Sequence, residues 1–336
     1  MSTTTTTASS GSGLRSATRF FAVWNLAILL VVLIIVFGIL KGDTFLTAFT
    51  FQSMVNSRSI NALAALAVMI PLTSNNYDLS VASTLGITQV LANGLVTQQG
   101  MPWQTAALLC ILLGAFVGLV NGILVTRAKI NSFIATLGIG TLLLGLNQWY
   151  TGGMQVVGLL PADFVALSGK LHGIPLPIIY VMAIAIVLWI VFDYLPLGRY
   201  LYVIGDSPRA AELTGIPATT YVTLAFIASG ILAAFAGVIL QAQLQVGQST
   251  VGQELMLPAF TGALLGATAI RPGRPNVWGT VLAVAVLAVA VAGLTQLGAP
   301  FFVENLFNGA MLVLAVGLAG YTYRRREQRN AAAAKR

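Results

Sequence analysis

The sequence predicts an all-α protein that crosses a lipid bilayer about ten times. Charged residues make up 8% of its 336 residues, hydrophobic residues make up 57%, and the mean hydropathy is +0.88. A soluble domain usually contains about 25% charged residues. So few charges cannot cover the surface of a soluble chain of this length, so lipid must be its main solvent.

The apolar segments approach the roughly 20 residues that a helix needs to cross a bilayer. They lie at 23–40, 59–72, 79–97, 105–126, 133–150, 177–195, 220–242, 255–270, 277–296 and 302–321. The first ends at Lys-Gly-Asp rather than at a small-residue cleavage site, which predicts an uncleaved span. The chain then divides into a disordered cytoplasmic tail (1–22), a transmembrane domain (23–321) and a basic cytoplasmic tail (322–336).

The basic residues predict the orientation in the membrane. If the N-terminus is cytoplasmic, every Lys and Arg except Lys41, Arg58 and Lys170 falls in a tail or loop on the cytoplasmic side. Placing Lys or Arg at the bilayer centre costs about 2.5–3.5 kcal/mol, and the bias of these residues in short loops sets the orientation. We therefore expect both termini in the cytoplasm, and we assign the net charge of +8 to topology rather than to nucleic-acid binding.

Glycines at four-residue spacing predict close helix packing. Gly114, Gly118 and Gly122 share one span, and Gly262 and Gly266 share another. Such a stripe lets two backbones approach, and we favour packing within the chain over a dimer interface. Residues 122–127 and 266–271 both run from Gly to Arg at the end of a span, which indicates a weak internal repeat.

The most informative segment is the polar loop at 196–218. Ser207 suits an N-cap, Pro208 suits the first helical position, and Gly215 with Pro217 ends the helix. A helix this short is unstable alone in water, so it needs a surface to dock on. The alternative is a connector that rests on the bilayer surface.

Four stretches of the chain resemble one family. Residues 197–217 (Leu-Gly-Arg-Tyr…Gly-Asp-Ser-Pro-Arg-Ala-Ala-Glu-Leu-Thr-Gly-Ile-Pro), 76–81 (Asn-Tyr-Asp-Leu-Ser-Val), 118–137 (Gly-Leu-Val-Asn-Gly…Asn-Ser-Phe-Ile-Ala-Thr-Leu) and 273–280 (Gly-Arg-Pro-Asn-Val-Trp-Gly-Thr) look like the ribose-type permeases of ABC sugar importers. These permeases belong to the branched-chain amino acid and ribose permease superfamily. The stretches run in the family's order over most of the folded chain. Residues 75–82 depart from the usual Gly-Gly-Ile-Asp-Leu-Ser-Val-Gly, and this departure bears on the substrate more than on the mechanism.

The resemblance implies a type II ABC importer architecture in a bacterial inner membrane. Such a permease pairs with a second copy or a paralogue, sits on ABC ATPase subunits and receives a monosaccharide or related polyol from a periplasmic binding protein. The loop that couples it to the ATPase corresponds here to Arg199, Gly205, Asp206, Ser207, Pro208, Arg209, Ala210, Ala211, Glu212 and Gly215. No Gly-x-x-x-x-Gly-Lys-Ser/Thr motif occurs, so ATP and magnesium are expected on the partner.

Polar residues inside or beside the spans are candidates for the translocation path: Asn75, Asn76, Asp78, Asn121 and Asn147. For Asp78 we favour capping of a helix that starts at Leu79 over contact with sugar hydroxyls or a gate. For the amides of Asn121 and Asn147 we favour bonds between helices over sugar contact.

Other functions have less support in the sequence. The chain shows no catalytic constellation, and its single histidine, His172, is a poor metal site, so we expect neither an enzyme nor a metalloprotein. A permease for branched-chain amino acids or nucleosides is the nearest alternative. A stand-alone secondary carrier is a further alternative, although such carriers usually place ionisable groups inside their spans.

Overall fold

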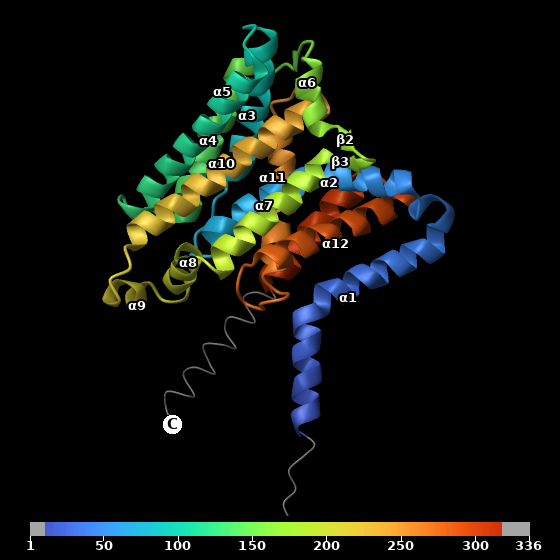
Figure 1. The fold of residues 1–336 in the computed structure, drawn as a ribbon, viewed down its shortest axis with the longest axis vertical. Helices are drawn as coiled ribbons and strands as arrows, with labels where there is room; N and C mark the ends of the chain where they lie inside the picture. The colour runs from blue at the N-terminus through green and yellow to red at the C-terminus, as the bar shows by residue number, and fades with distance from the viewer. Residues whose placement is uncertain (1–10, 318–336) are drawn as a thin grey trace, which may run out of the picture.

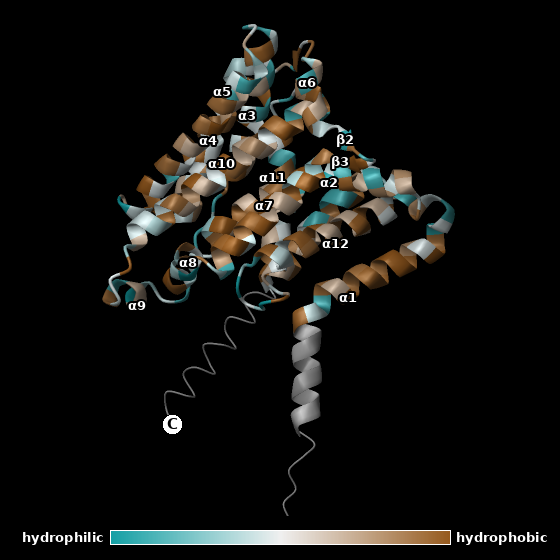
Figure 2. Ribbon diagram, in the orientation of Figure 1, coloured by the Kyte–Doolittle hydropathy of each residue, from teal (hydrophilic) through white to brown (hydrophobic). Residues whose placement is uncertain are grey.

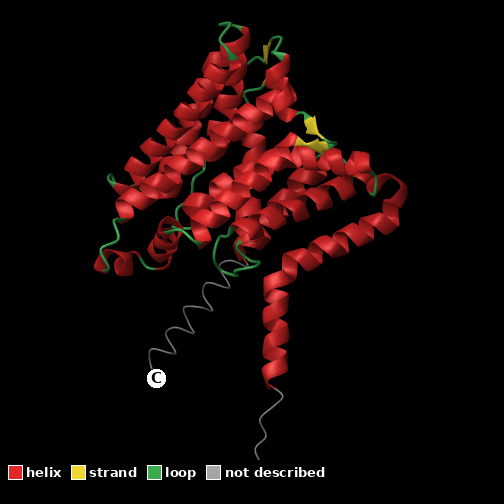
Figure 3. Ribbon diagram, viewed as in Figure 1, coloured by secondary structure: helices red, strands yellow, loops and turns green. Residues whose placement is uncertain are grey.

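The computed structural model describes residues 11–317 of the chain, and its side chains from residue 23 onward. Figure 3 shows that nearly all of this part is helical. The first helix, α1 (Gly11–Phe45), begins well before Val23, so residues 11–22 are helical where a disordered tail was predicted. The basic tail at 322–336 lies outside the described residues.

Each predicted apolar segment coincides with a helix. The long helices are α2 (Ala48–Leu72), α3 (Ser80–Thr97), α4 (Trp103–Thr126), α5 (Ser132–Thr151), α7 (Leu176–Asp193), α10 (Ala218–Leu244), α11 (Val251–Gly266), α12 (Val277–Gln296) and an apolar helix at Phe302–Gly317. Figure 1 shows how they pack side by side, with α1 at the edge of the bundle. The all-α prediction is confirmed.

The short elements lie in the connections. They are β1 (Val156–Val157), α6 (Ala162–Val165), η1 (Ala166–Ser168), β2 (Lys170–Leu171), β3 (Ile174–Pro175), α8 (Pro196–Asp206), α9 (Pro208–Leu213) and β4 (Val246–Gly247). The strands form two antiparallel pairs, β1 with β4 and β2 with β3. The first pair ties the loop after α5 to the end of α10.

Six helices within residues 11–317 are long and apolar enough to cross a membrane: α1 from Val23, α2, α4, α7, α10 and α12. The remaining predicted spans are helical but shorter or more polar, so the count of ten crossings stays a prediction. Helix α2 starts at Ala48 rather than near residue 59. Its first turns contain Gln52, Asn56 and Arg58. Because these residues are polar, a search for apolar runs does not detect this part of the helix.

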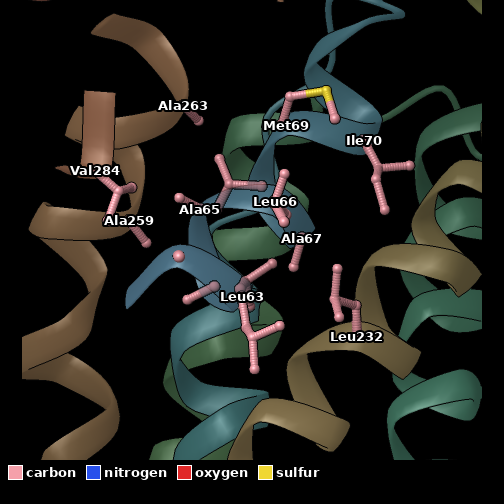
Figure 4. Close-up of a cluster of buried hydrophobic side chains, with 14 of the residues drawn as sticks. Leu63, Ala65, Leu66, Ala67, Met69, Ile70, Leu232, Ala259, Ala263 and Val284 are labelled. Carbon is pink, nitrogen blue, oxygen red and sulfur yellow. The ribbon is translucent and has the colours of Figure 1, made fainter. Parts of the chain in front are cut away.

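The core forms where α2 meets α10, α11 and α12. Figure 4 shows Leu63 and Leu66 of α2 among Leu232 of α10, Ala263 of α11 and Val284 of α12. The share of buried residues is 78% in the span of α2 and only 11% in that of α1. Figure 2 shows brown, apolar residues along α1, α4 and α7, and on these helices Val31, Leu112 and Val187 are exposed.

The glycine stripe of α4 packs against α10, as predicted for contact within the chain. A Cβ atom on Gly114 would meet the backbone of Gly230, and one on Gly118 would meet the backbone of Phe226. The two backbones therefore touch without intervening side chains. Gly266 makes the same kind of approach, to the backbone of Thr280 in α12.

Different loops, each with a basic residue, lie at the two ends of α7. At one end, Arg271 from the α11–α12 loop makes a two-point ion pair with Asp193 at the end of α7, over 2.7 and 2.9 Å. Lys170, predicted on the other side of the membrane, lies beyond the opposite end of α7 and donates to Gln52 over 2.7 Å. Arg271 and Lys170 therefore lie at opposite ends of α7.

Candidate functional site

Helix α9 forms as its sequence predicts. The Ser207 hydroxyl accepts a hydrogen bond from the Ala210 N–H over 3.3 Å, and Pro208 occupies the first turn. Gly215 follows the helix with φ of +76°, a conformation that favours glycine. The cap, the proline and the glycine set where this helix begins and ends.

One side of α9 is anchored and the other is free. Ala211 is fully buried in a cluster with Ile204 of α8 and Phe226 of α10. On the outer side, Arg209 and Glu212 form an ion pair over 3.1 Å, with 80% and 64% of their side chains exposed. Leu213, which the sequence analysis did not single out, is 76% exposed. This outer side offers an apolar residue flanked by charges.

Helix α8 was predicted only as part of a polar loop, and the structure corrects this. Residues 196–206 form an amphipathic helix: Leu201 and Ile204, three residues apart, lie on its buried face, and Arg199 is exposed. Tyr202 is also buried and donates a hydrogen bond to the Pro275 carbonyl over 2.7 Å. Burial raises the pKa of Tyr202 to about 12, which keeps this donor protonated at any physiological pH.

Residues of the α11–α12 loop hold α8 in place. Arg274 forms an ion pair with Asp206 at the end of α8. The same guanidinium lies 5.8 Å from the centre of the Tyr202 ring, a cation–π distance. Sequence reasoning named Asp206 but missed Arg274 and Tyr202, because pairs so far apart in the chain leave no local signal.

The segment between α2 and α3, residues 73–79, is a break in helical structure, and we call it the α2–α3 break. Asn75 is exposed and has φ of +59°, and Asn76 donates to the Ser74 carbonyl over 3.0 Å. The N–H groups of Tyr77 and Leu79 donate to hydroxyls of α5 rather than to a helix carbonyl. The break is thus tied to α5 by side chains.

Asp78 is the buried acidic residue of the break. One carboxylate oxygen accepts hydrogen bonds from the Ser80 N–H over 3.1 Å and the Ser80 hydroxyl over 2.6 Å. The other accepts from the Ser229 hydroxyl of α10 over 2.9 Å. Helix α3 begins at Ser80, one residue later than predicted, and its N-cap residue is Leu79, whose side chain makes no capping bond. The Asp78 carboxylate instead accepts from the N–H of the first helical residue, Ser80. Among residues 23–317, none of the ion pairs includes Asp78.

One of the two span asparagines bonds to another helix, and the other bonds to a loop. The Asn121 amide of α4 donates to the Ser80 hydroxyl over 2.7 Å, which joins it to Asp78 in one buried network. The Asn147 amide of α5 donates to the Ser249 carbonyl over 3.2 Å, away from that network. Both side-chain oxygens are buried without a partner among the described residues. The five path candidates therefore do not form one cluster.

A separate cavity of about 500 Å³ lies between α1, α2, α7 and α12. Its lining is apolar, with residues such as Leu30, Met54 and Val289, apart from Arg58 and a few hydroxyls. A sugar needs several converging hydrogen-bond partners, so this cavity is unsuited to one. No group of metal-ligating side chains occurs in the part of the chain that the structure describes.

Comparison with known proteins matches residues 50–316 to a family described as "Branched-chain amino acid transport system / permease component". The chain is 31% identical to the Ribose import permease protein RbsC of Bacillus subtilis (strain 168) over 293 residues, which cover 85% of this chain and 89% of the relative. It is 29% identical to the Autoinducer 2 import system permease protein LsrD of Yersinia pseudotuberculosis serotype O:1b (strain IP 31758) over 298 residues, which cover 87% and 89%. No solved structure matches the chain.

Proposed function

Because the chain belongs to the family of branched-chain amino acid transport system permease components, we propose that it is the membrane-spanning subunit of an ABC importer for a monosaccharide or related polyol. The relative named as a ribose import permease, similar over most of both chains, carries this proposal. The subunit is a transport component rather than an enzyme. A partner ATPase and a binding protein complete such an importer.

The outer side of α9 is the proposed contact with the ATPase. It combines an exposed Leu213 with the charges of Arg209 and Glu212, at the end of the bundle predicted to be cytoplasmic. The segment from Arg199 to Gly215 would transmit the motion of the ATPase to the membrane helices. ATP and magnesium would be bound by the partner, since this sequence has no phosphate-binding Gly-rich motif.

The translocation path is proposed to run beside the α2–α3 break, with a second copy or a paralogue forming its other side. Asn75 and Asn76 are not fully buried at the predicted cytoplasmic end, so they are open to a passing solute. Asp78, within the break, and Asn121 of α4 both bond to the Ser80 hydroxyl, and these buried bonds hold the break against α3 and α4. We propose an inner-membrane location with both termini cytoplasmic, from the distribution of Lys and Arg.

Reconstitution tests the proposal. The permease, its ATPase and its binding protein are incorporated in liposomes, and uptake of radiolabelled ribose and other monosaccharides is measured. We expect uptake that requires both ATP and the binding protein. Uptake by the permease alone, without the ATPase, would instead identify a secondary carrier.

The family description leaves an amino acid substrate as the second candidate. The same liposomes therefore receive leucine, isoleucine and valine in a parallel assay. ATP-dependent uptake of these amino acids in place of sugars would reject the sugar while retaining the ABC permease.

A further inference from the structure

The end of α8 touches the α2–α3 break directly. A Cβ atom on Gly205 would meet the Thr73 carbonyl oxygen and would lie 3.1 Å from Ser74 Cα. No side chain fits between these two backbones, so a shift of α8 toward α2 cannot be absorbed by a change of rotamer. The contact joins the segment proposed to bind the ATPase to the segment proposed to line the path.

The break can move without breaking a regular helix. Pro71 lies in the last turn of α2 and lacks an N–H, so the ladder of helix hydrogen bonds is already interrupted there. Beyond it, the Tyr77 N–H bonds to the Ser132 hydroxyl and the Leu79 N–H bonds to the Thr136 hydroxyl, over 3.1 and 3.0 Å. Hydroxyl groups rotate and accept from several directions, so these bonds can adjust to a displaced backbone.

The other side of α8 is fixed to the α11–α12 loop. The Asp206–Arg274 ion pair and the hydrogen bond from Tyr202 to Pro275 hold it there. Gly205 lies between these two attachments, and α9 follows after Ser207. A force applied to α9 therefore acts on Gly205 through a short and well-anchored helix.

We propose that Gly205 is the residue through which the ATPase moves the α2–α3 break, and that this displacement opens and closes the predicted cytoplasmic end of the path. This inference rests on the proposed function. In the proposed function, α9 provides the contact with the ATPase. The inference adds that Gly205 positions the break and that residues 73–79 are the element that moves.

The first experiment substitutes glycines in the complete transporter reconstituted in liposomes. Gly205→Ala is expected to lower sugar uptake per ATP hydrolysed at least tenfold, while ATP hydrolysis and assembly persist. Gly198→Ala is the matched control in the same helix, because its Cβ would meet the backbone of Phe192 in α7 instead of the break. Gly145→Ala controls for any glycine change, since nothing lies within 4 Å of its Cβ position. Normal uptake per ATP in Gly205→Ala, or an equal loss in Gly198→Ala, would overturn the proposal.

The second experiment needs no change at Gly205. Tyr77→Cys is introduced together with Cys110→Ala, which removes the only native thiol. Tyr77 is exposed, so we expect a thiol reagent to label the new side chain at rates that differ at least threefold between the nucleotide-free and vanadate-trapped transporter. Equal labelling rates in a transporter with ATP-driven uptake would show that the break does not move. A wild-type complex without ATP-driven uptake would reject the proposed function instead.

Discussion

The α2–α3 break and helix α9 are both polar, but they satisfy their polar groups in opposite ways. In the break, Asp78 is buried and accepts hydrogen bonds from α3 and from α10. In α9, Arg209 and Glu212 pair with each other and face outward. Loss of Asp78 therefore leaves buried groups without partners, whereas a change on the outer side of α9 leaves the fold intact. The carboxylate of the break is held inside the bundle, and the charges of α9 are available to another protein.

Removing the buried acceptor should have the largest effect on stability. Asp78→Ala leaves the hydroxyls of Ser80 and Ser229 without their acceptor, at about 1–3 kcal/mol for each buried group, so we expect a loss of about 3 kcal/mol. Thermal unfolding of the purified protein in detergent measures it. Asp78→Asn, which keeps one acceptor oxygen, should lose less than half as much. Equal unfolding of Asp78→Ala and wild type would show that the network does not stabilise the bundle.

Removing one donor should have a smaller effect. Ser229→Ala deletes a single buried hydrogen bond, for which about 1 kcal/mol is expected. The exposed Ser53→Ala in α2 is the control and should unfold as wild type does. Combining Ser229→Ala with Asp78→Asn should cost less than the sum of the two changes, because the partners are in contact. If the losses of stability of the two single variants add up fully in the double variant, the hydrogen bond between Ser229 and Asp78 is contradicted.

Changes on α9 should have the smallest effect on stability and a large one on assembly. Leu213→Asp alters an exposed side chain, so stability should stay within about 0.5 kcal/mol of wild type. Recovery of the ATPase in a pull-down through the permease should fall at least tenfold, because a charge replaces the apolar contact. Exchanging Arg209 and Glu212 keeps their ion pair but inverts the surface charges, and should uncouple ATP hydrolysis from uptake. Normal recovery and coupling in both variants would make α9 a simple connector.

The sequence predicted α9 because its signals are local: Ser207, Pro208 and Gly215 act within one short segment. The helices were predicted because lipid requires long apolar runs. Helix α8 was missed, because its mixture of polar and apolar residues forms no long apolar run. The bonds of Asp78 to Ser229 and of Arg274 to Asp206 could not be predicted, because they depend on how distant helices pack.

Helix α2 has consequences for how the protein is made. Among the six long apolar helices its mean hydropathy is the lowest, 1.3 against 3.0 for α1, yet its buried share is the largest. Its neighbours Leu232, Ala259 and Val284 leave the ribosome long after it does. Helix α2 therefore enters the membrane before the helices that cover it exist, and its final burial must await the C-terminal half. Biosynthesis thus ends with a late assembly step, and a nascent chain stopped after α7 would hold α2 in contact with lipid.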